Sequence, residues 1–196
     1  MKPVRQTIKY EAERDPNFAR EIAAIPGCEN LPSCFQCGTC SAACLVSTFM
    51  DYTPRRVIAL TRSGFKDEAL RCQTIWLCTS CYACTVECPK EIQITNIMYA
   101  LKQRAIREKV YPKGLSIPVL AQEFYKLVLK RGRSTESWLV IRLFWRTNIL
   151  KILGMARLGL NLLRTGRMSF RADSIRQTRE LQRLLEAAEA EKGMAK

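Results

Sequence analysis

The spacing of apolar positions along the chain predicts helices almost throughout. The pair Asp15-Pro16 is a helix start and Pro26-Gly27 a helix stop, so the first helix is expected to end at Ile25. Thr53-Pro54 starts a second helix over 55–62, which Gly64 closes. Further helices are expected at 67–75, from about Thr95 to about Lys109, near 117–131, over 135–164 with a break near Asn148 or Gly154, and at 173–192. Alternation with a period of two is nearly absent, so the sequence predicts an all-α protein.

Charge and cysteine are unevenly distributed along the chain. Residues 1–100 contain all ten cysteines and carry 11 Lys/Arg against 10 Asp/Glu, a net charge of +1. Residues 101–196 carry 21 Lys/Arg against 8 Asp/Glu, a net charge of +13. We therefore expect an N-terminal helical arm over 1–27, a cysteine-bearing domain over 28–110 and a basic helical extension over 111–196. Such an extension suits nucleic acid, an anionic membrane or an acidic protein surface.

The residue types that are missing exclude several kinds of chemistry. The 196 residues include no histidine, which excludes Ser-His and Cys-His nucleophile pairs, His-ligated haem and His-containing zinc sites. The nine glycines never fall as G-x-G, and no G-x-x-x-x-G-K-[ST] occurs, so neither common nucleotide-binding fingerprint is present. The chemistry of the chain is therefore expected to depend on its cysteines.

Targeting signals and membrane spans are not predicted. The charged stretch after Met1 lacks the apolar core of a secretory signal. The apolar stretch 138–163 is interrupted by Arg142, Arg146, Lys151 and Arg157, so it falls short of the ~20 apolar residues that a transmembrane helix needs. We expect a cytoplasmic protein, and in that reducing compartment ten cysteines favour metal ligation over disulfides.

One cysteine pattern occurs twice. The run Cys34-x₂-Cys37-x₂-Cys40-x₃-Cys44 recurs as Cys78-x₂-Cys81-x₂-Cys84-x₃-Cys88. Three thiolates on one short loop suit three iron corners of a [4Fe–4S] cube, and in two-cluster ferredoxins the fourth cysteine of each run ligates the other cluster. We therefore expect two [4Fe–4S] clusters, the first held by Cys34, Cys37, Cys40 and Cys88 and the second by Cys78, Cys81, Cys84 and Cys44.

Zinc and disulfides are the alternatives for these eight cysteines. Structural zinc prefers two well-separated C-x₂-C pairs, which fits two runs of four cysteines less well. Two cysteines, Cys28 and Cys72, lie outside the runs; we expect small buried side chains, with a spare ligand or a redox-active thiol as the alternative. Trp76, Ile92 and Ile94 flank the second run, either as plain core residues or as side chains that shield the clusters from water.

The cysteine-bearing half resembles a known family. The 33 residues between Cys44 and Cys78 carry helix signals, as in the α-helical ferredoxin domain. The segments Cys34-Phe-Gln-Cys-Gly-Thr-Cys-Ser-Ala-Ala-Cys and Trp76-Leu-Cys-Thr-Ser-Cys-Tyr-Ala-Cys resemble the C subunit of heterodisulfide reductase and its relatives in sulfur metabolism. The resemblance extends over about residues 28–110. Leu45 departs from it, since the family usually has proline after this cysteine.

The resemblance implies an electron-transfer subunit that does not itself turn over a substrate. In such complexes a flavin-bearing, A-like subunit delivers electrons, the C subunit relays them through two [4Fe–4S] clusters, and a cysteine-rich, B-like subunit reduces or oxidises a disulfide or thiol substrate. The chain has neither a dinucleotide fingerprint nor an adjacent Cys-Cys pair, which agrees with this division of roles. The alternative is a ferredoxin-like subunit of a membrane-associated, quinone-linked oxidoreductase.

The basic extension carries more apolar surface than a lone helix needs. The segment 137–164 has a face with Trp138, Ile141 and Trp145 and further apolar residues around it. We expect it to pack against a partner subunit; packing on its own domain and contact with a membrane surface are the alternatives. No zinc-finger, helix-turn-helix or stacking-aromatic pattern is present, so no nucleic-acid partner is expected.

Overall fold

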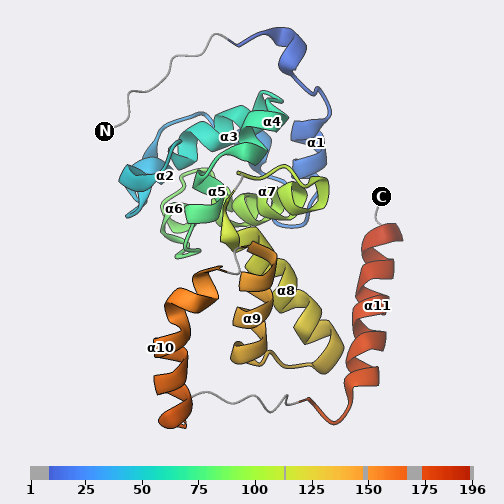
Figure 1. Cartoon of the computed structure of the whole chain (residues 1–196). Coiled ribbons are helices and arrows are strands. Elements are labelled where there is room, and N and C mark those ends of the chain that lie inside the picture. Colours follow the sequence, from blue (N-terminus) through green and yellow to red (C-terminus); the bar gives the residue numbers. More distant parts are fainter. Residues whose placement is uncertain (1–8, 113, 148–149, 167–173, 195–196) are drawn as a thin grey trace. The chain divides into compact units, whose positions relative to one another are not determined.

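The computed structural model describes residues 9–112, 114–147, 150–166 and 174–194. Every regular element in those ranges is helical, which confirms the predicted all-α class (Figure 1). The chain divides into two compact units, Met1–Lys113 and Gly114–Lys196. None of the helices within the described ranges is long and apolar enough to cross a membrane.

The first unit is built from short helices and one long one. Short helices dominate because the cysteine runs and their turns interrupt the chain repeatedly. In order, the elements are η1 (Glu11–Glu13), α1 (Phe18–Ala23), η2 (Leu31–Ser33), α2 (Thr39–Ala42), η3 (Ser47–Phe49), α3 (Pro54–Arg62), α4 (Lys66–Arg71), α5 (Thr74–Leu77), α6 (Ala83–Val86) and α7 (Ile94–Glu108).

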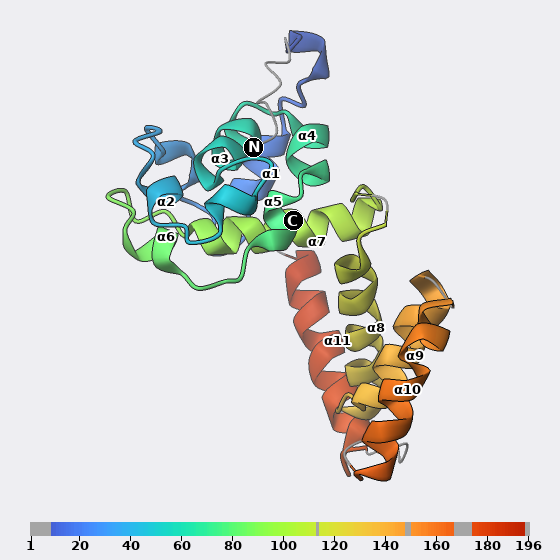
Figure 2. The ribbon, with the colours of Figure 1, turned by 60° about the vertical axis from the view of Figure 1, so that its left-hand side comes forward.

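Helix α7 is the centre of this unit. Ile97, Leu101 and Ala105 recur every four residues, so they share one face, and each is fully buried. Around that helix pack α1, α4, α5 and α6, as Figure 2 shows. Phe18 and Ile22 of α1 complete the core, with 0% and 1% of their surface exposed. The cysteine loops are therefore supported by a packed apolar core.

Two predicted helices have other bounds in the structure, and the first, α1, also ends two residues earlier than the expected Ile25. The Asp15 carboxylate accepts a hydrogen bond from the backbone N–H of Asn17 (3.0 Å), and the helix begins only at Phe18. The helix expected over 67–75 is split into α4 and α5, because Cys72 is extended (ψ 149°). Helix α3 ends as predicted, with Gly64 in the left-handed region (φ 80°).

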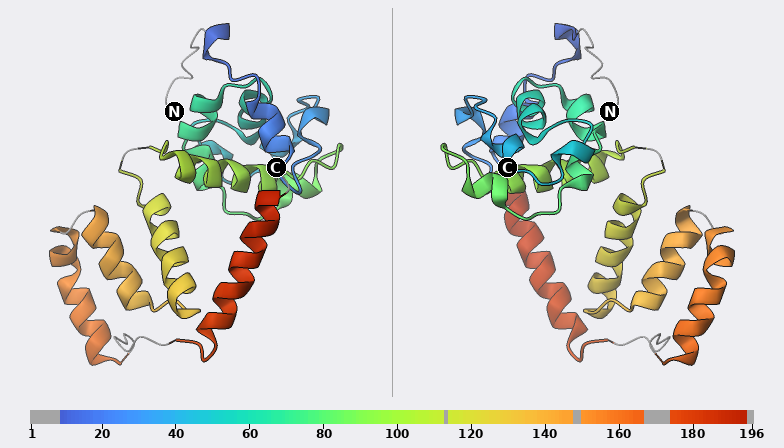
Figure 3. Two further views of the ribbon diagram at one scale, coloured as in Figure 1. Left: turned by 90° about the vertical axis from the view of Figure 1, so that its right-hand side faces the viewer. Right: turned by 90° about the vertical axis from the view of Figure 1, so that its left-hand side faces the viewer.

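The second unit contains α8 (Ser116–Arg131), α9 (Glu136–Thr147), α10 (Leu150–Arg164) and α11 (Thr178–Met194) (Figure 3). The first two helices pack against each other, and α10 contacts α9. Helix α11 contacts α8, and the backbone N–H of Ile175 donates to the carbonyl of Arg131 at the end of α8 (2.9 Å). Of the two expected breaks, Asn148 lies outside the described residues and Gly154 lies inside α10.

A buried carboxylate ties α8 to α9. Glu123 of α8 is only 4% exposed and forms ion pairs with Arg146 (3.0 Å) and Arg142 (3.7 Å) of α9, and with Lys126 (3.3 Å) of its own helix. These cations offset the cost of removing the carboxylate from water.

Apolar side chains are exposed on α9 and α10: Trp145 of α9 is 73% exposed and Leu160 of α10 is 59% exposed.

Candidate functional site

The two cysteine runs fold alike. In each run, the residues on either side of the second cysteine have a left-handed backbone: Gln36 (φ 64°) and Gly38 (φ 92°) in the first, Ser80 (φ 59°) and Tyr82 (φ 62°) in the second. Non-glycine residues adopt this conformation at a cost of about 1–2 kcal/mol. Turns with such residues direct successive backbone N–H groups into a concave anion site of the kind found at iron–sulfur centres.

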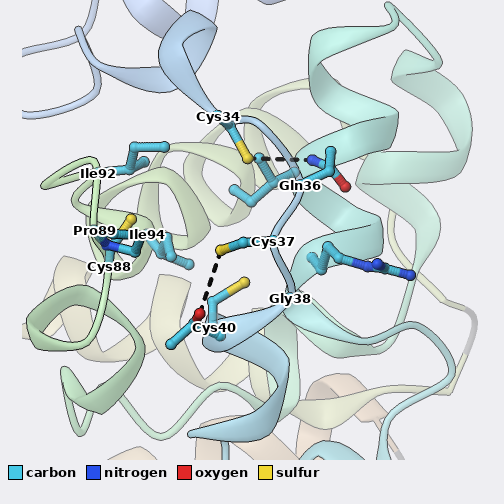
Figure 4. Close-up of a pocket in the computed structure, with 12 residues that line it drawn as sticks. Cys34, Gln36, Cys37, Gly38, Cys40, Cys88, Pro89, Ile92 and Ile94 are labelled. Carbon is cyan, nitrogen blue, oxygen red and sulfur yellow. Dashed lines mark hydrogen bonds between the residues drawn. The ribbon is translucent and has the colours of Figure 1, made fainter.

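A first cysteine pocket combines both runs. Cys34, Cys37 and Cys40 reach it from the first run, and Cys88 reaches it from the end of the second (Figure 4). Pro89, Ile92 and Ile94 lie on the same side as Cys88. The full lining is Cys34, Gln36, Cys37, Gly38, Thr39, Cys40, Arg55, Ile58, Cys88, Pro89, Ile92 and Ile94.

A second cysteine pocket has the reciprocal composition. Cys78, Cys81 and Cys84 come from the second run and Cys44 from the first, and no charged residue lines the space. The other lining residues are Val46, Met50, Pro54, Thr79, Ser80, Tyr82, Thr95 and Met98. Contact between α2 and α6, the short helices within the runs, holds the two runs together.

The exposure of the thiols repeats between the runs. All ten cysteines are free thiols, and the second cysteine of each run, Cys37 or Cys81, is exposed, whereas the other six in the runs are partly or fully buried. Burial raises the pKa of Cys40 to about 11 and also raises the pKa of Cys84. Iron ligation requires thiolates, so a bound cation would offset the cost of deprotonating these buried sulfurs.

Gln36, Thr39 and Thr95 place polar groups at hydrogen-bonding distance from sulfurs of the two runs. The Gln36 amide donates to Cys34 Sγ (3.3 Å), and the Thr39 hydroxyl lies 3.3 Å from Cys37 Sγ, where hydrogen bonding lowers the pKa of that thiol (Figure 4). In the second pocket the Thr95 hydroxyl lies 3.8 Å from Cys84 Sγ. The sequence did not single out these three polar residues, because their types are common and only the fold brings them to sulfur.

Two cations fix the backbone where each run begins. The Arg62 guanidinium donates to the carbonyl oxygens of Cys34 and Pro32, the latter at 3.0 Å. Lys102 of α7 donates to the carbonyl of Cys78 (3.1 Å). Both runs are therefore attached to neighbouring helices at their first cysteine.

The number and type of the thiols in each cysteine pocket match the ligands of a four-iron cluster. Within the described part of the chain, no group of three or more His, Cys, Asp or Glu side chains is close enough to hold one metal ion. A [4Fe–4S] cube instead takes one thiolate at each of four separate iron corners, so its ligands lie farther apart. Four free thiols around a largely apolar pocket are the ligands that such a cube requires, and each cysteine pocket supplies four.

The remaining residues noted in the sequence lie outside the two groups of four cysteines. Cys28 and Cys72 are 1% and 3% exposed and line neither cysteine pocket, so the structure places them in the core. Trp76 is 5% exposed and packs edge-on against Tyr111, with ring centroids 6.2 Å apart. Ile92, at 2% exposure, is a core residue that also lines the first cysteine pocket.

Comparisons with known proteins place the cysteine-bearing half among iron–sulfur proteins. Residues 30–92 match the 4Fe-4S dicluster domain. The chain is 34% identical over 102 residues to the C subunit of the H(2):CoB-CoM heterodisulfide,ferredoxin reductase of Methanothermobacter marburgensis, covering 52% of this chain and 55% of that protein. It is 28% identical over 117 residues to the iron-sulfur C subunit of the CoB–CoM heterodisulfide reductase of Methanopyrus kandleri, covering 56% and 61%. The chain thus spans about half the length of the curated relatives it matches.

Proposed function

We propose that this chain, whose cysteine-bearing half is similar to heterodisulfide reductase C subunits, is the electron-transfer subunit of a heterodisulfide reductase-like complex. Electrons pass through two [4Fe–4S] clusters between a flavin-bearing, A-like subunit on one side and, on the other, a cysteine-rich, B-like subunit that reduces or oxidises a disulfide or thiol substrate. The chain itself turns over no substrate, and it works in the cytoplasm. The observation that carries the proposal is the pair of cysteine pockets, each with four free thiols.

The grouping of the cysteines around the two pockets supports a ligand assignment. The first cluster is held by Cys34, Cys37, Cys40 and Cys88, and the second by Cys78, Cys81, Cys84 and Cys44, as their grouping around the pockets supports. When bound, the clusters accept and donate single electrons. The protein orients the thiolates, keeps water away with apolar side chains and sets the potential through hydrogen bonds to sulfur.

Paired cysteine replacements test the assignment. If Cys34 and Cys88 share one cluster, then Cys34→Ser with Cys88→Ser damages that cluster and leaves the other with its native electron paramagnetic resonance (EPR) signal. The double variant Cys78→Ser/Cys88→Ser also removes two thiols, but these belong to different pockets, so both clusters are perturbed. Cys72→Ser is the matched control outside the pockets and leaves both signals unchanged.

The opposite pattern would refute this assignment. If each run of four cysteines held its own cluster, the Cys78/Cys88 pair would damage one cluster and the Cys34/Cys88 pair both. Iron and acid-labile sulfide measured on anoxically purified wild-type protein give the baseline, about eight irons per chain for two cubes. A zinc protein without sulfide would refute the proposal as a whole.

The basic extension is proposed to dock on a partner subunit. Its exposed apolar side chains, such as Trp145 and Leu160, lie in a half of the chain with a net charge of +13, which suits an acidic partner with apolar patches. Anoxic purification of the tagged full-length chain from its host should yield a flavoprotein and a cysteine-rich protein in constant ratio. If the chain instead remains with membranes through a high-salt wash and neither of these proteins co-purifies, the alternative of a quinone-linked oxidoreductase is favoured.

A further inference from the structure

A cationic pocket of about 290 Å³ adjoins the first cysteine pocket and opens to solvent. Ligand sites typically measure about 300–1,000 Å³, so this volume has room for a small ligand but not for a dinucleotide. Three cations line it and no carboxylate does. The complete lining is Lys9, Gln36, Arg55, Arg56, Ala59, Leu60, Ser63 and Phe65.

The positive charge in this pocket is only partly neutralised. Lys9 contacts the carboxylate of Glu68, whereas neither Arg55 nor Arg56 forms an ion pair with any acidic residue that the structure describes. The Arg56 Nε–H is buried and has no hydrogen-bond partner among the described residues. An unpaired buried donor is energetically unfavourable.

The surroundings strengthen the attraction for an anion. Phe65, Leu60 and Ala59 form apolar walls, and the Lys9 ammonium lies 4.8 Å from the centroid of the Phe65 ring. Charges interact more strongly beside apolar walls than in open water. Burial, and to a lesser extent repulsion from Arg56, lowers the pKa of Lys9.

We propose that the cationic pocket binds a small oxyanion, through a phosphate or carboxylate group, and that the bound anion lowers the reduction potential of the first cluster. Gln36 and Arg55 line both the cationic pocket and the first cysteine pocket, and Gln36 also donates to Cys34 Sγ. A cluster gains negative charge on reduction, so an anion bound next to it disfavours reduction. By thermodynamic linkage, reduction lowers the affinity for the anion by the same factor. This coupling rests on the proposed ligation of the first cluster.

Binding is measured by titrating pyrophosphate, and separately citrate, into the oxidised full-length holoprotein in a calorimeter at constant ionic strength. We expect saturable binding at one site, with at least tenfold weaker affinity in Arg56→Gln. Arg71→Gln is the matched control, because it removes the same charge from the exposed surface of α4. Tighter binding of pyrophosphate identifies a phosphate ligand, and tighter binding of citrate a carboxylate ligand. Non-saturable binding, or equal affinities of the two variants, would overturn the site.

The coupling is measured by EPR-monitored redox titration with saturating pyrophosphate and with chloride at matched ionic strength. With pyrophosphate, the midpoint potential of one cluster should fall in the wild type and in Arg71→Gln but not in Arg56→Gln. If the oxidised protein binds the anion ten times more tightly than the reduced protein, this potential falls by about 59 mV for one electron. Unchanged potentials at saturation would overturn the coupling. Iron, sulfide and the two cluster signals are measured independently of the anion, so failure of this site is distinguishable from failure of the proposed function.

Discussion

Gly38 offers a direct test of the loop geometry around the first cysteine pocket. Its φ of 92° lies outside the left-handed well of other residues, which extends from about +50° to +70°. An added Cβ would lie 3.7 Å from Cδ of Arg55, an ordinary contact distance, so Gly38→Ala meets no steric clash. The cost is therefore conformational, about 1–2 kcal/mol. Tyr82, at the equivalent position of the second run, has a φ of 62°, within the well.

This cost should appear in the rate at which the first cluster is lost. If release of iron requires the loop to open, a strain of about 1–2 kcal/mol accelerates release by about 5- to 30-fold. The charge-transfer absorbance of the holoprotein is followed after a strong iron chelator is added under anoxic conditions. We expect Gly38→Ala to decay in two phases of similar amplitude, one fast and one at the wild-type rate.

The control and the refuting outcomes follow from the same structure. Gly159→Ala changes a glycine in α10 whose added Cβ would meet no atom within 4 Å, so its decay should match the wild type. A Gly38→Ala variant that decays at the wild-type rate would show that the left-handed turn does not retain the cluster. Equal acceleration of both phases would show that the two loops do not open separately.

Three further predictions concern single side chains. Burial raises the pKa of Cys28 to about 11 and that of Cys72 to about 12, so iodoacetamide at about pH 8 should label neither thiol in the native protein; native labelling as fast as in urea would contradict this. The Asp51 carboxylate accepts the backbone N–H groups of Gln73 (2.8 Å) and Thr74 (2.9 Å), so Asp51→Ala should lower the free energy of unfolding by about 1–3 kcal/mol in urea titrations, and Asp51→Asn by less; identical midpoints for all three proteins would refute this. Glu123→Gln should destabilise the second unit, because it removes the negative charge from three ion pairs; the expected cost is only about 1–2 kcal/mol, since the cationic partners are half-exposed. Thermal melting followed by circular dichroism measures this cost, and an unchanged melting temperature would show that the ion pairs contribute nothing.

The cysteine repeat was the part of the site most readable from sequence. In two-cluster ferredoxins, three ligands of one cube come from a short loop and the fourth from a distant residue. The spacing of Cys34, Cys37 and Cys40 is that of such a loop. The structure brings Cys88 to the same pocket as that loop, which is the grouping that the repeat predicts. The helices at 54–62 and 94–108 were also predictable, because caps and apolar period agree there.

Other features depend on contacts between segments that are distant along the chain. Nothing in the sequence near Lys9 indicates that it lies with Arg55 and Arg56 in one pocket, since 45 or more positions separate them. The break between α4 and α5 was missed because the apolar pattern continues through Cys72, whose burial fits a helix as well as the observed extended turn. The cytoplasmic location and the domain boundaries at 27 and 110 remain predictions.

The sharing of cysteines between the two pockets has a consequence for biosynthesis. When only the first run has been translated, the cysteines of the first pocket are incomplete. Cys34, Cys37 and Cys40 are present, but Cys88 follows Cys44, α3, α4 and α5 in the chain and is not yet made. With the proposed ligation, the second set is complete only at Cys84 and the first only at Cys88, so iron delivered before the second run is translated would meet an open, oxidisable loop. Under that ligation, maturation of either centre is postponed until most of the second run has been translated.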